Sequence, residues 1–108
     1  MIVNKKNQGN YVQYELTGSK LSIRQGELAL DLSRYERDYP VHLDISENAY
    51  GMLVMGSSYR YVAEIDIPAR EYQIEKGEKD DLGFPKLSKK AVTFDAEKVS
   101  LTLWAVGV

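Results

Sequence analysis

The sequence predicts an all-β fold: an antiparallel β-sandwich or a small β-barrel of about nine short strands, with little or no helix. Between Tyr59 and Ile67, apolar residues take the odd positions, and mostly polar residues, with Val62 among them, take the even ones. Successive side chains of a strand point to opposite faces, so this spacing gives one apolar and one solvated face. Turn signals recur every ~8–12 residues, and no segment has the length and period of a helix of three or more turns.

Four strands are expected in the N-terminal half, each bounded by glycine, serine or asparagine. They cover residues 11–16, 21–23, 27–32 and 41–45. Leu28, Leu30 and Leu32 share one face of the third, and Pro40 precedes the fourth, where a missing N–H is tolerated. The polar stretch between these two strands favours a connection or a single helical turn.

The C-terminal half is expected to open with a long β-hairpin over residues 50–67. Its first arm, residues 50–55, is nearly all apolar, which indicates a strand covered on both faces. Further strands are expected at 71–75, 91–95 and 99–106. Residues 76–90 have no period and are expected to form a long polar loop.

Length, charge and cysteine content limit the class of protein. The chain of 108 residues suits one domain, residues 1–108, and it contains no cysteine for a disulfide or a thiolate site. The formal net charge is −2, from 14 basic and 16 acidic residues that are mixed along the chain, which argues against a nucleic-acid partner. No apolar run is long enough to span a membrane and no signal peptide is visible, so we expect no membrane partner and a cytoplasmic location.

The only histidine, His42, alternates with Asp44 and Ser46 on one strand. These residue types match a hydrolytic triad, but same-face neighbours along a strand project in parallel and lie ~6.5–7 Å apart. A triad needs the base within hydrogen-bonding distance of the nucleophile. The pattern therefore favours a solvated strand face, and we expect no catalytic residues and no enzymatic activity.

The remaining acidic residues give no cofactor or metal motif. Glu64 and Asp66 share the polar face of the central strand with Arg60, and cross-strand salt bridging is their expected role. Asp80 and Asp81 could meet a calcium ion only with help from backbone carbonyls, and one histidine without cysteine leaves zinc unsupported. Glycine-rich nucleotide motifs are absent, so no cofactor and no metal are expected.

Eight tyrosines are the most unusual feature of the composition. Tyrosine suits half-buried strand positions, and it is also enriched at interfaces. The candidate interaction surface brings together loop aromatics: Tyr35, Tyr39, Tyr50 and Phe84.

Two functions remain open. The first is a non-enzymatic interaction or assembly module that binds a protein partner or itself through a tyrosine-bearing face or an edge strand. Self-association into a homo-oligomer is expected because residues 99–106 carry no charge, and a bare apolar edge invites pairing with another chain. The alternative is a small-ligand or carbohydrate-binding domain, which would need the tyrosines and Trp104 to converge on a concave surface.

Overall fold

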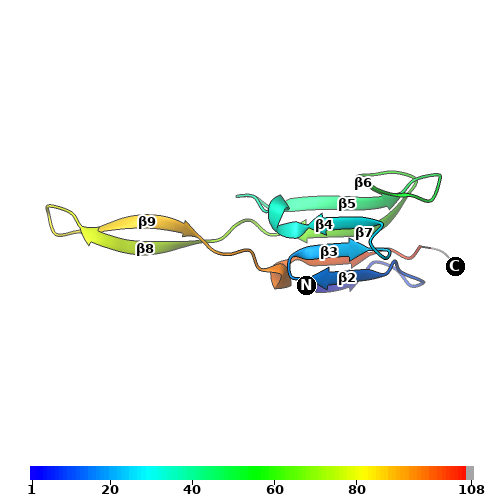
Figure 1. Ribbon diagram of the computed structural model, residues 1–108, viewed down its shortest axis with the longest axis horizontal. Coiled ribbons are helices and arrows are strands. Elements are labelled where there is room, and N and C mark those ends of the chain that lie inside the picture. The colour runs from blue at the N-terminus through cyan, green and yellow to red at the C-terminus, as the bar shows by residue number, and fades with distance from the viewer. Residues whose placement is uncertain (107–108) are drawn as a thin grey trace.

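The structure, a computed structural model, describes residues 1–106 and confirms the all-β fold. Ten strands form three sheets, and the only helical segments among these residues are two short 3-10 turns, η1 (Leu32–Tyr35) and η2 (Ala96–Lys98). The molecule measures 69 × 21 × 21 Å. Figure 1 shows the reason for this elongated shape: a two-layered body from which a two-stranded arm projects.

The larger layer of the body is a five-stranded sheet. Its strands, in spatial order, are β1 (Ile2–Lys5), β10 (Ser100–Leu103), β7 (Arg60–Ile67), β5 (Val41–Glu47) and β6 (Leu53–Met55). All neighbours are antiparallel except β1 and β10, which are parallel. The apolar strand β10 therefore lies inside the sheet, as its lack of charge requires, and it offers no free edge to another chain.

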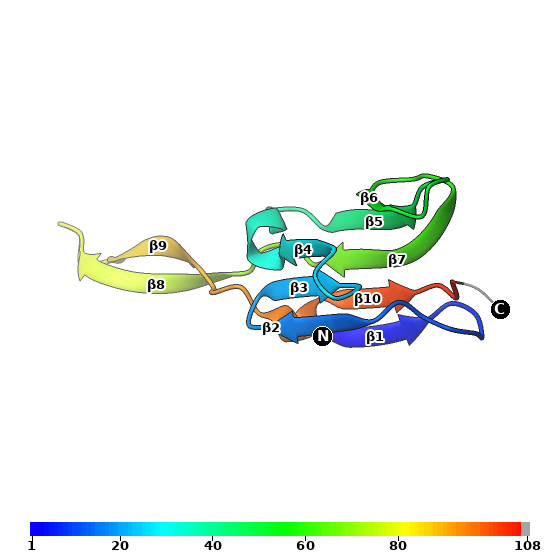
Figure 2. The same ribbon diagram turned by 45° about the vertical axis from the view of Figure 1, so that its right-hand side comes forward.

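The smaller layer is a three-stranded antiparallel sheet of β2 (Tyr14–Thr17), β3 (Lys20–Ile23) and β4 (Leu28–Asp31). It covers one face of the five-stranded sheet (Figure 2). Asp31 ends β4 and caps η1, because its side chain accepts a hydrogen bond from the backbone N–H of Ser33. Of the two alternatives for the stretch between the third and fourth predicted strands, a connection or a single helical turn, the structure has a short helical turn followed by a connection.

The hydrophobic core lies between the two layers. Leu21 and Ile23 of β3 and Ile45, Ile65 and Leu101 of the larger sheet are all completely buried. Each comes from the apolar parity of its strand, so the dyad pattern of the sequence decides which side chains are buried. Removal of this apolar surface from water is the main stabilisation of the body.

A β-bulge changes the alternation of β7 at one point. Ile45 of β5 lies opposite Ala63, and Ser46 lies opposite Tyr61. Val62 is therefore an extra residue of β7 that has no opposite residue on β5. Val62 is 1% exposed and joins the core beside Ala63. The expectation that Val62 lies on the solvated face is therefore wrong, because the bulge turns two consecutive side chains to the same side.

The expected hairpin of residues 50–67 is also wrong. Strand β6 does not pair with β7, because both pair with β5, which lies between them. The apolar run was expected to be covered on both faces, yet it forms only the short edge strand β6. The side chain of Met55 on that strand is 41% exposed.

The predicted loop at 76–90 is a β-hairpin instead. Strands β8 (Tyr72–Lys79) and β9 (Pro85–Ala91) pair with each other and with no other strand. Every residue of both strands is exposed to solvent. We call β8, β9 and the turn between them the arm; it projects from one end of the body (Figure 1).

Two further differences concern the end of β9 and the N-terminal strand β1. The strand expected at 91–95 ends at Ala91, and the following residues lead irregularly into η2. Strand β1 is not among the strands that the sequence predicts.

Among residues 1–106, no helix is long and apolar enough to cross a membrane.

Candidate functional site

A histidine–carboxylate cluster occupies the outer face of the five-stranded sheet, away from the core. The register of β5 and β7 places His42 opposite Asp66 and Asp44 opposite Glu64. The Nδ1 atom of His42 lies 2.6 Å from Asp66 Oδ1, and its Nε2 atom lies 2.8 Å from Asp44 Oδ1. The carboxylate of Glu64 is 3.5 Å from the same Nε2 atom. Cross-strand pairing of Glu64 and Asp66 thus occurs, with His42 as the partner.

The carboxylates favour the charged form of the imidazole. The hydrogen bond to Asp66, followed by the one to Asp44, raises the pKa of His42 above its usual 6.5, against a smaller opposing effect of desolvation. Both ring nitrogens can donate only when the ring is an imidazolium. In that form, the cluster is an ion-pair network in which the imidazolium neutralises part of the surrounding negative charge.

The same geometry bears on metal binding. One ligand atom from each of His42, Asp44 and Glu64 can be chosen so that all three lie within 4.8 Å of one another. Asp66 at the other ring nitrogen is placed as an outer-shell carboxylate would be. When the ring is protonated, it competes with a metal ion for this position, because Nε2 then carries a proton and cannot act as a ligand.

Ser46 takes no part in this cluster. It is completely buried, and its hydroxyl donates to the backbone carbonyl of Gly56 at 2.6 Å. His42, Asp44 and Ser46 occupy alternate positions of β5. Both nitrogens of the imidazole nevertheless contact carboxylates, and neither contacts the Ser46 hydroxyl.

Trp104 is engaged at the end of the same sheet. Its ring stacks on Tyr61 with a centroid distance of 5.8 Å, and its Nε1–H donates to Glu64 Oε2 at 2.7 Å. The ammonium of Lys6 lies 5.7 Å from the centroid of the ring. These contacts order the indole within the sheet.

The four aromatic residues of the candidate interaction surface do not form one surface. Tyr35 ends η1 and packs against the core, while Tyr39 is exposed in the connection to β5. Phe84 is in the turn of the arm, and Tyr50 is in the turn between β5 and β6 at the opposite end of the molecule (Figure 1). The ring on which Trp104 stacks is that of Tyr61, which is not one of the four.

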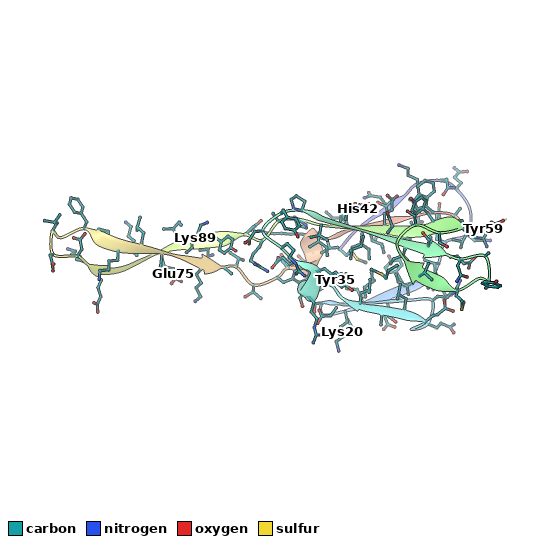
Figure 3. The ribbon with its side chains drawn as sticks, turned by 90° about the horizontal axis from the view of Figure 1, so that it is seen from above. Lys20, Tyr35, His42, Tyr59, Glu75 and Lys89 are labelled. Carbon is teal, nitrogen blue, oxygen red and sulfur yellow. The ribbon has the colours of Figure 1, made fainter. Side chains whose placement is uncertain are left out.

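The arm has two chemically different faces. Residues directly opposite in an antiparallel pair share a face, and alternate residues along each strand do the same. One face, which we call the apolar face of the arm, carries Tyr72, Ile74, Lys76, Leu87, Lys89 and Ala91. The other, the polar face of the arm, carries Gln73, Glu75, Ser88 and Lys90. Figure 3 labels Lys89 and Glu75, one from each face.

The turn of the arm presents two more large apolar side chains. The Asp80 carboxylate accepts hydrogen bonds from the backbone N–H groups of Leu82 and Phe84, each at 2.9 Å. Gly83 between them has a φ of +83°, which glycine adopts without steric cost. The turn is thereby ordered with Leu82 82% exposed and Phe84 65% exposed. Asp80, which the sequence suggested only as a weak calcium ligand, therefore shapes this turn.

Sequence reasoning missed the arm although a signal was present. Tyr72 and Ile74 alternate with polar residues before the turn, and Leu87 and Ala91 do so after it. One extra residue in β8 between Lys76 and Lys79 breaks the period.

Comparison of this chain with protein-family models, with curated proteins and with solved structures finds no match.

Proposed function

We propose that this chain is a non-enzymatic assembly module that joins copies of itself through the apolar face of the arm. The observation that carries the proposal is a hairpin with one apolar face and nothing within residues 1–106 to cover it. Ile74 is 61% exposed and Leu87 is 65% exposed. In an antiparallel sheet, this alternation of apolar and polar faces is typical of strands that pack on a core.

The arm shares no hydrophobic core with the body. None of the buried core residues lies between 68 and 98, and β8 and β9 pair only with each other. An isolated two-stranded hairpin is at best marginally stable in water and needs a hydrophobic surface to pack against. A partner that covers the apolar face would supply that surface, at about 1.5–3 kcal/mol for each large apolar side chain that it fully buries.

The base of the arm is fixed so that the arm projects. Tyr72 donates a hydrogen bond from its hydroxyl to Asp38, and Arg70 contacts Asp38 and Glu36. The backbone N–H of Val92 donates to the carbonyl of Glu71 at 2.9 Å, which closes the two strands at their origin. These contacts fix the base of the arm relative to the body in the absence of a partner. Preorganisation of this kind lowers the entropy that is lost on binding.

A second copy is the partner that the chain itself supports. Exposed apolar side chains are also present on the body, away from the arm, so another copy offers a surface of the required chemistry. Closed symmetric assemblies of one chain are the commonest form of oligomer among soluble proteins. Mixed charge over the rest of the surface opposes unspecific collapse.

The test compares the two faces of the arm. Size-exclusion chromatography with light scattering should give the unmodified protein a multiple of 12.3 kDa. The double variant Ile74→Lys/Leu87→Lys should have the mass of one chain, because it removes two large aliphatic side chains from this face and adds two charges beside Lys76 and Lys89. The matched variant Gln73→Lys/Ser88→Lys adds the same charge to the polar face and should assemble as the unmodified protein does. An unmodified protein of 12.3 kDa at high concentration would refute the proposal.

A further inference from the structure

We infer that His42, Asp44 and Glu64 form a reversible binding site for one zinc ion on the outer face of the five-stranded sheet, with Asp66 as the outer-shell partner of the histidine. The three ligands come from the neighbouring strands β5 and β7. Figure 3 shows His42 on the body of the molecule. The arm takes no part in this site, so the site is independent of the proposed function.

The spacing of the three ligand atoms is close to the spacing around a tetrahedral ion. Zinc binds nitrogen and carboxylate oxygen at about 2.0–2.2 Å, which puts the ligand atoms of a tetrahedron about 3.3–3.6 Å apart. The Nε2 atom of His42 lies 2.8 Å from Asp44 Oδ1 and 3.5 Å from Glu64 Oε1. All three ligand atoms lie within 4.8 Å of one another. Zinc binding therefore needs small rotations of side chains and no change in the register of the strands.

Asp66 leaves a lone pair of the imidazole facing the other two carboxylates. The Nδ1 atom of His42 lies 2.6 Å from Asp66 Oδ1, and a neutral imidazole has one N–H to donate. The tautomer that donates from Nδ1 to Asp66 leaves the Nε2 lone pair directed at the oxygens of Asp44 and Glu64. Three acceptors then face one another with no donor among them. A cation between them removes this repulsion, and a histidine held by a carboxylate at its other nitrogen is the usual arrangement in zinc sites.

Glu64 is held in the orientation that the site needs. The Nε1–H of Trp104 donates to Glu64 Oε2 at 2.7 Å, which leaves Oε1 on the side of His42. Stacking of Trp104 on Tyr61 orders the indole that makes this contact. Two of the three ligands thus have outer-shell partners, and such partners orient ligands and strengthen metal binding.

The cluster carries negative charge that no lysine or arginine neutralises. Within residues 1–106, the carboxylates of Asp44, Glu64 and Asp66 have no lysine or arginine nitrogen within 4.0 Å. Glu47, on the same strand as His42, is by contrast paired with two arginines. The mutual repulsion of the three carboxylates favours any cation that enters the cluster.

The donor set favours zinc over magnesium and calcium. Zinc accepts imidazole nitrogen and carboxylate oxygen together, whereas magnesium and calcium prefer six or more oxygen ligands. The His42 side chain is 46% exposed, so water can take the fourth position of a tetrahedral ion. No sequence motif reveals these ligands, because only the pairing of β5 with β7 brings His42 and Glu64 together. The expectation of no metal rested on local patterns alone.

Isothermal titration calorimetry with zinc chloride, on protein without a polyhistidine tag, measures the binding directly. The chain has one histidine and no cysteine, so no second site of this kind competes. The unmodified protein should bind one ion per chain. His42→Gln removes the nitrogen ligand and should abolish saturable binding. Asp66→Asn keeps all three ligands and should weaken binding by about 10–100-fold, as loss of an outer-shell partner does.

Two controls separate a specific site from unspecific attraction of cations. Glu75→Gln removes a carboxylate of the arm and should bind zinc as the unmodified protein does. An excess of magnesium or calcium chloride should leave zinc bound. Zinc binding of equal strength in the unmodified protein and in His42→Gln would overturn the inference, as would a lack of saturable binding or displacement of zinc by magnesium. Far-ultraviolet circular dichroism of each variant checks that the sheet is intact.

Urea denaturation followed by circular dichroism gives a second readout. An ion that binds only the folded chain raises the free energy of unfolding, so zinc should shift the denaturation midpoint of the unmodified protein upward. The arm variant Ile74→Lys/Leu87→Lys retains the site and should show the same shift, whatever its state of assembly. His42→Gln should show none. A shift of equal size in His42→Gln would contradict the site, and the masses from light scattering test the proposed function separately.

Discussion

Ile74 and Lys89 lie directly opposite each other in the arm, and both side chains project from its apolar face. The next pair along the strands, Glu75 and Ser88, projects from the other face. This division of side chains supports the proposal that the arm packs on a surface with one side and meets solvent with the other. Within residues 1–106 the body supplies no such surface, so the body should fold independently of the arm.

Removal of the arm should leave the body folded. The origins of β8 and β9 are adjacent, so residues 73–90 can be replaced by an Asn-Gly turn between Tyr72 and Ala91. The free energy of unfolding of the body should change by no more than ~1 kcal/mol, because no core residue is lost. Urea denaturation followed by Trp104 fluorescence measures it. A variant that is unfolded in buffer would show that the arm belongs to the folding unit of the body.

Because of the bulge in β7, Val62 should contribute to the stability of the fold. Because this side chain is buried in the core, Val62→Ala should lower the free energy of unfolding by about 1–3 kcal/mol. Strict alternation would put Val62 on the solvated face, where the substitution would cost less than ~0.5 kcal/mol. Denaturant titration of this variant beside Thr102→Ala, a half-buried outer-face control on β10, distinguishes the two arrangements.

Glu47 is predicted to be the most sensitive charged residue. Its carboxylate receives hydrogen bonds from Arg60 at 2.6 Å and from Arg24 at 2.6 Å, and its side chain is only 11% exposed. Glu47→Gln should destabilise the fold by about 1.5–3 kcal/mol, which is typical of hydrogen bonds to charged groups. Glu27→Gln removes a carboxylate that is 44% exposed and should cost less than ~1 kcal/mol. Equal effects of the two substitutions would contradict the structure.

The same contacts give Glu47 a pH dependence. Hydrogen bonds from Arg60 and then Arg24 lower the pKa of Glu47 below its usual 4.5. Its contribution to stability is therefore complete above about pH 4.5 and is lost as the pH falls through the folded-state pKa. The stability difference between the unmodified protein and Glu47→Gln should shrink in acid, as measured by urea denaturation between pH 6 and pH 3. A difference that does not change with pH would exclude this role.

His42 should titrate in the opposite sense. Its folded-state pKa is raised, so its contribution to stability is complete below about pH 6.5 and is lost as the pH rises through the folded-state pKa. As the only histidine, it gives a single resolved imidazole signal in an NMR titration. Asp66→Asn should lower this pKa more than Asp44→Asn does, because the hydrogen bond to Asp66 has the larger effect. A pKa at or below 6.5 in the unmodified protein would contradict the cluster.

Much of the body could be predicted from the sequence because apolar and polar residues alternate along its strands. Leu21 and Ile23, like Leu101 and Leu103, are buried on the parity that their spacing indicates. The interior position of β10 also follows from its lack of charge. These predictions depend only on which side chains avoid water, and that property is local to each strand.

Long-range register could not be predicted in the same way. Two of the three carboxylates around His42, Glu64 and Asp66, come from a strand more than twenty residues later. The extra residue Val62 decides the faces of Tyr61 and Arg60. Strand β1 pairs with β10 from the other end of the chain. A local pattern contains no information on such pairings, because they are selected by packing of the whole sheet.

The arm escaped prediction for a related reason. Its apolar residues are diluted by five lysines, and the shift between Lys76 and Lys79 interrupts the alternation. The four tyrosine and phenylalanine positions chosen from composition alone are scattered over the molecule. Composition shows that a chain contains interface-forming residues, but only the topology shows which of them share a face.

Hydrogen exchange of the backbone amides of β8 and β9 tests the central claim most directly. If another copy covers the arm, these amides should exchange slowly at high protein concentration and faster on dilution, while the amides of β7 and β10 keep their protection. The variant Ile74→Lys/Leu87→Lys should show fast exchange in the arm at every concentration. Exchange in the arm of the unmodified protein that is fast and independent of concentration would contradict the account.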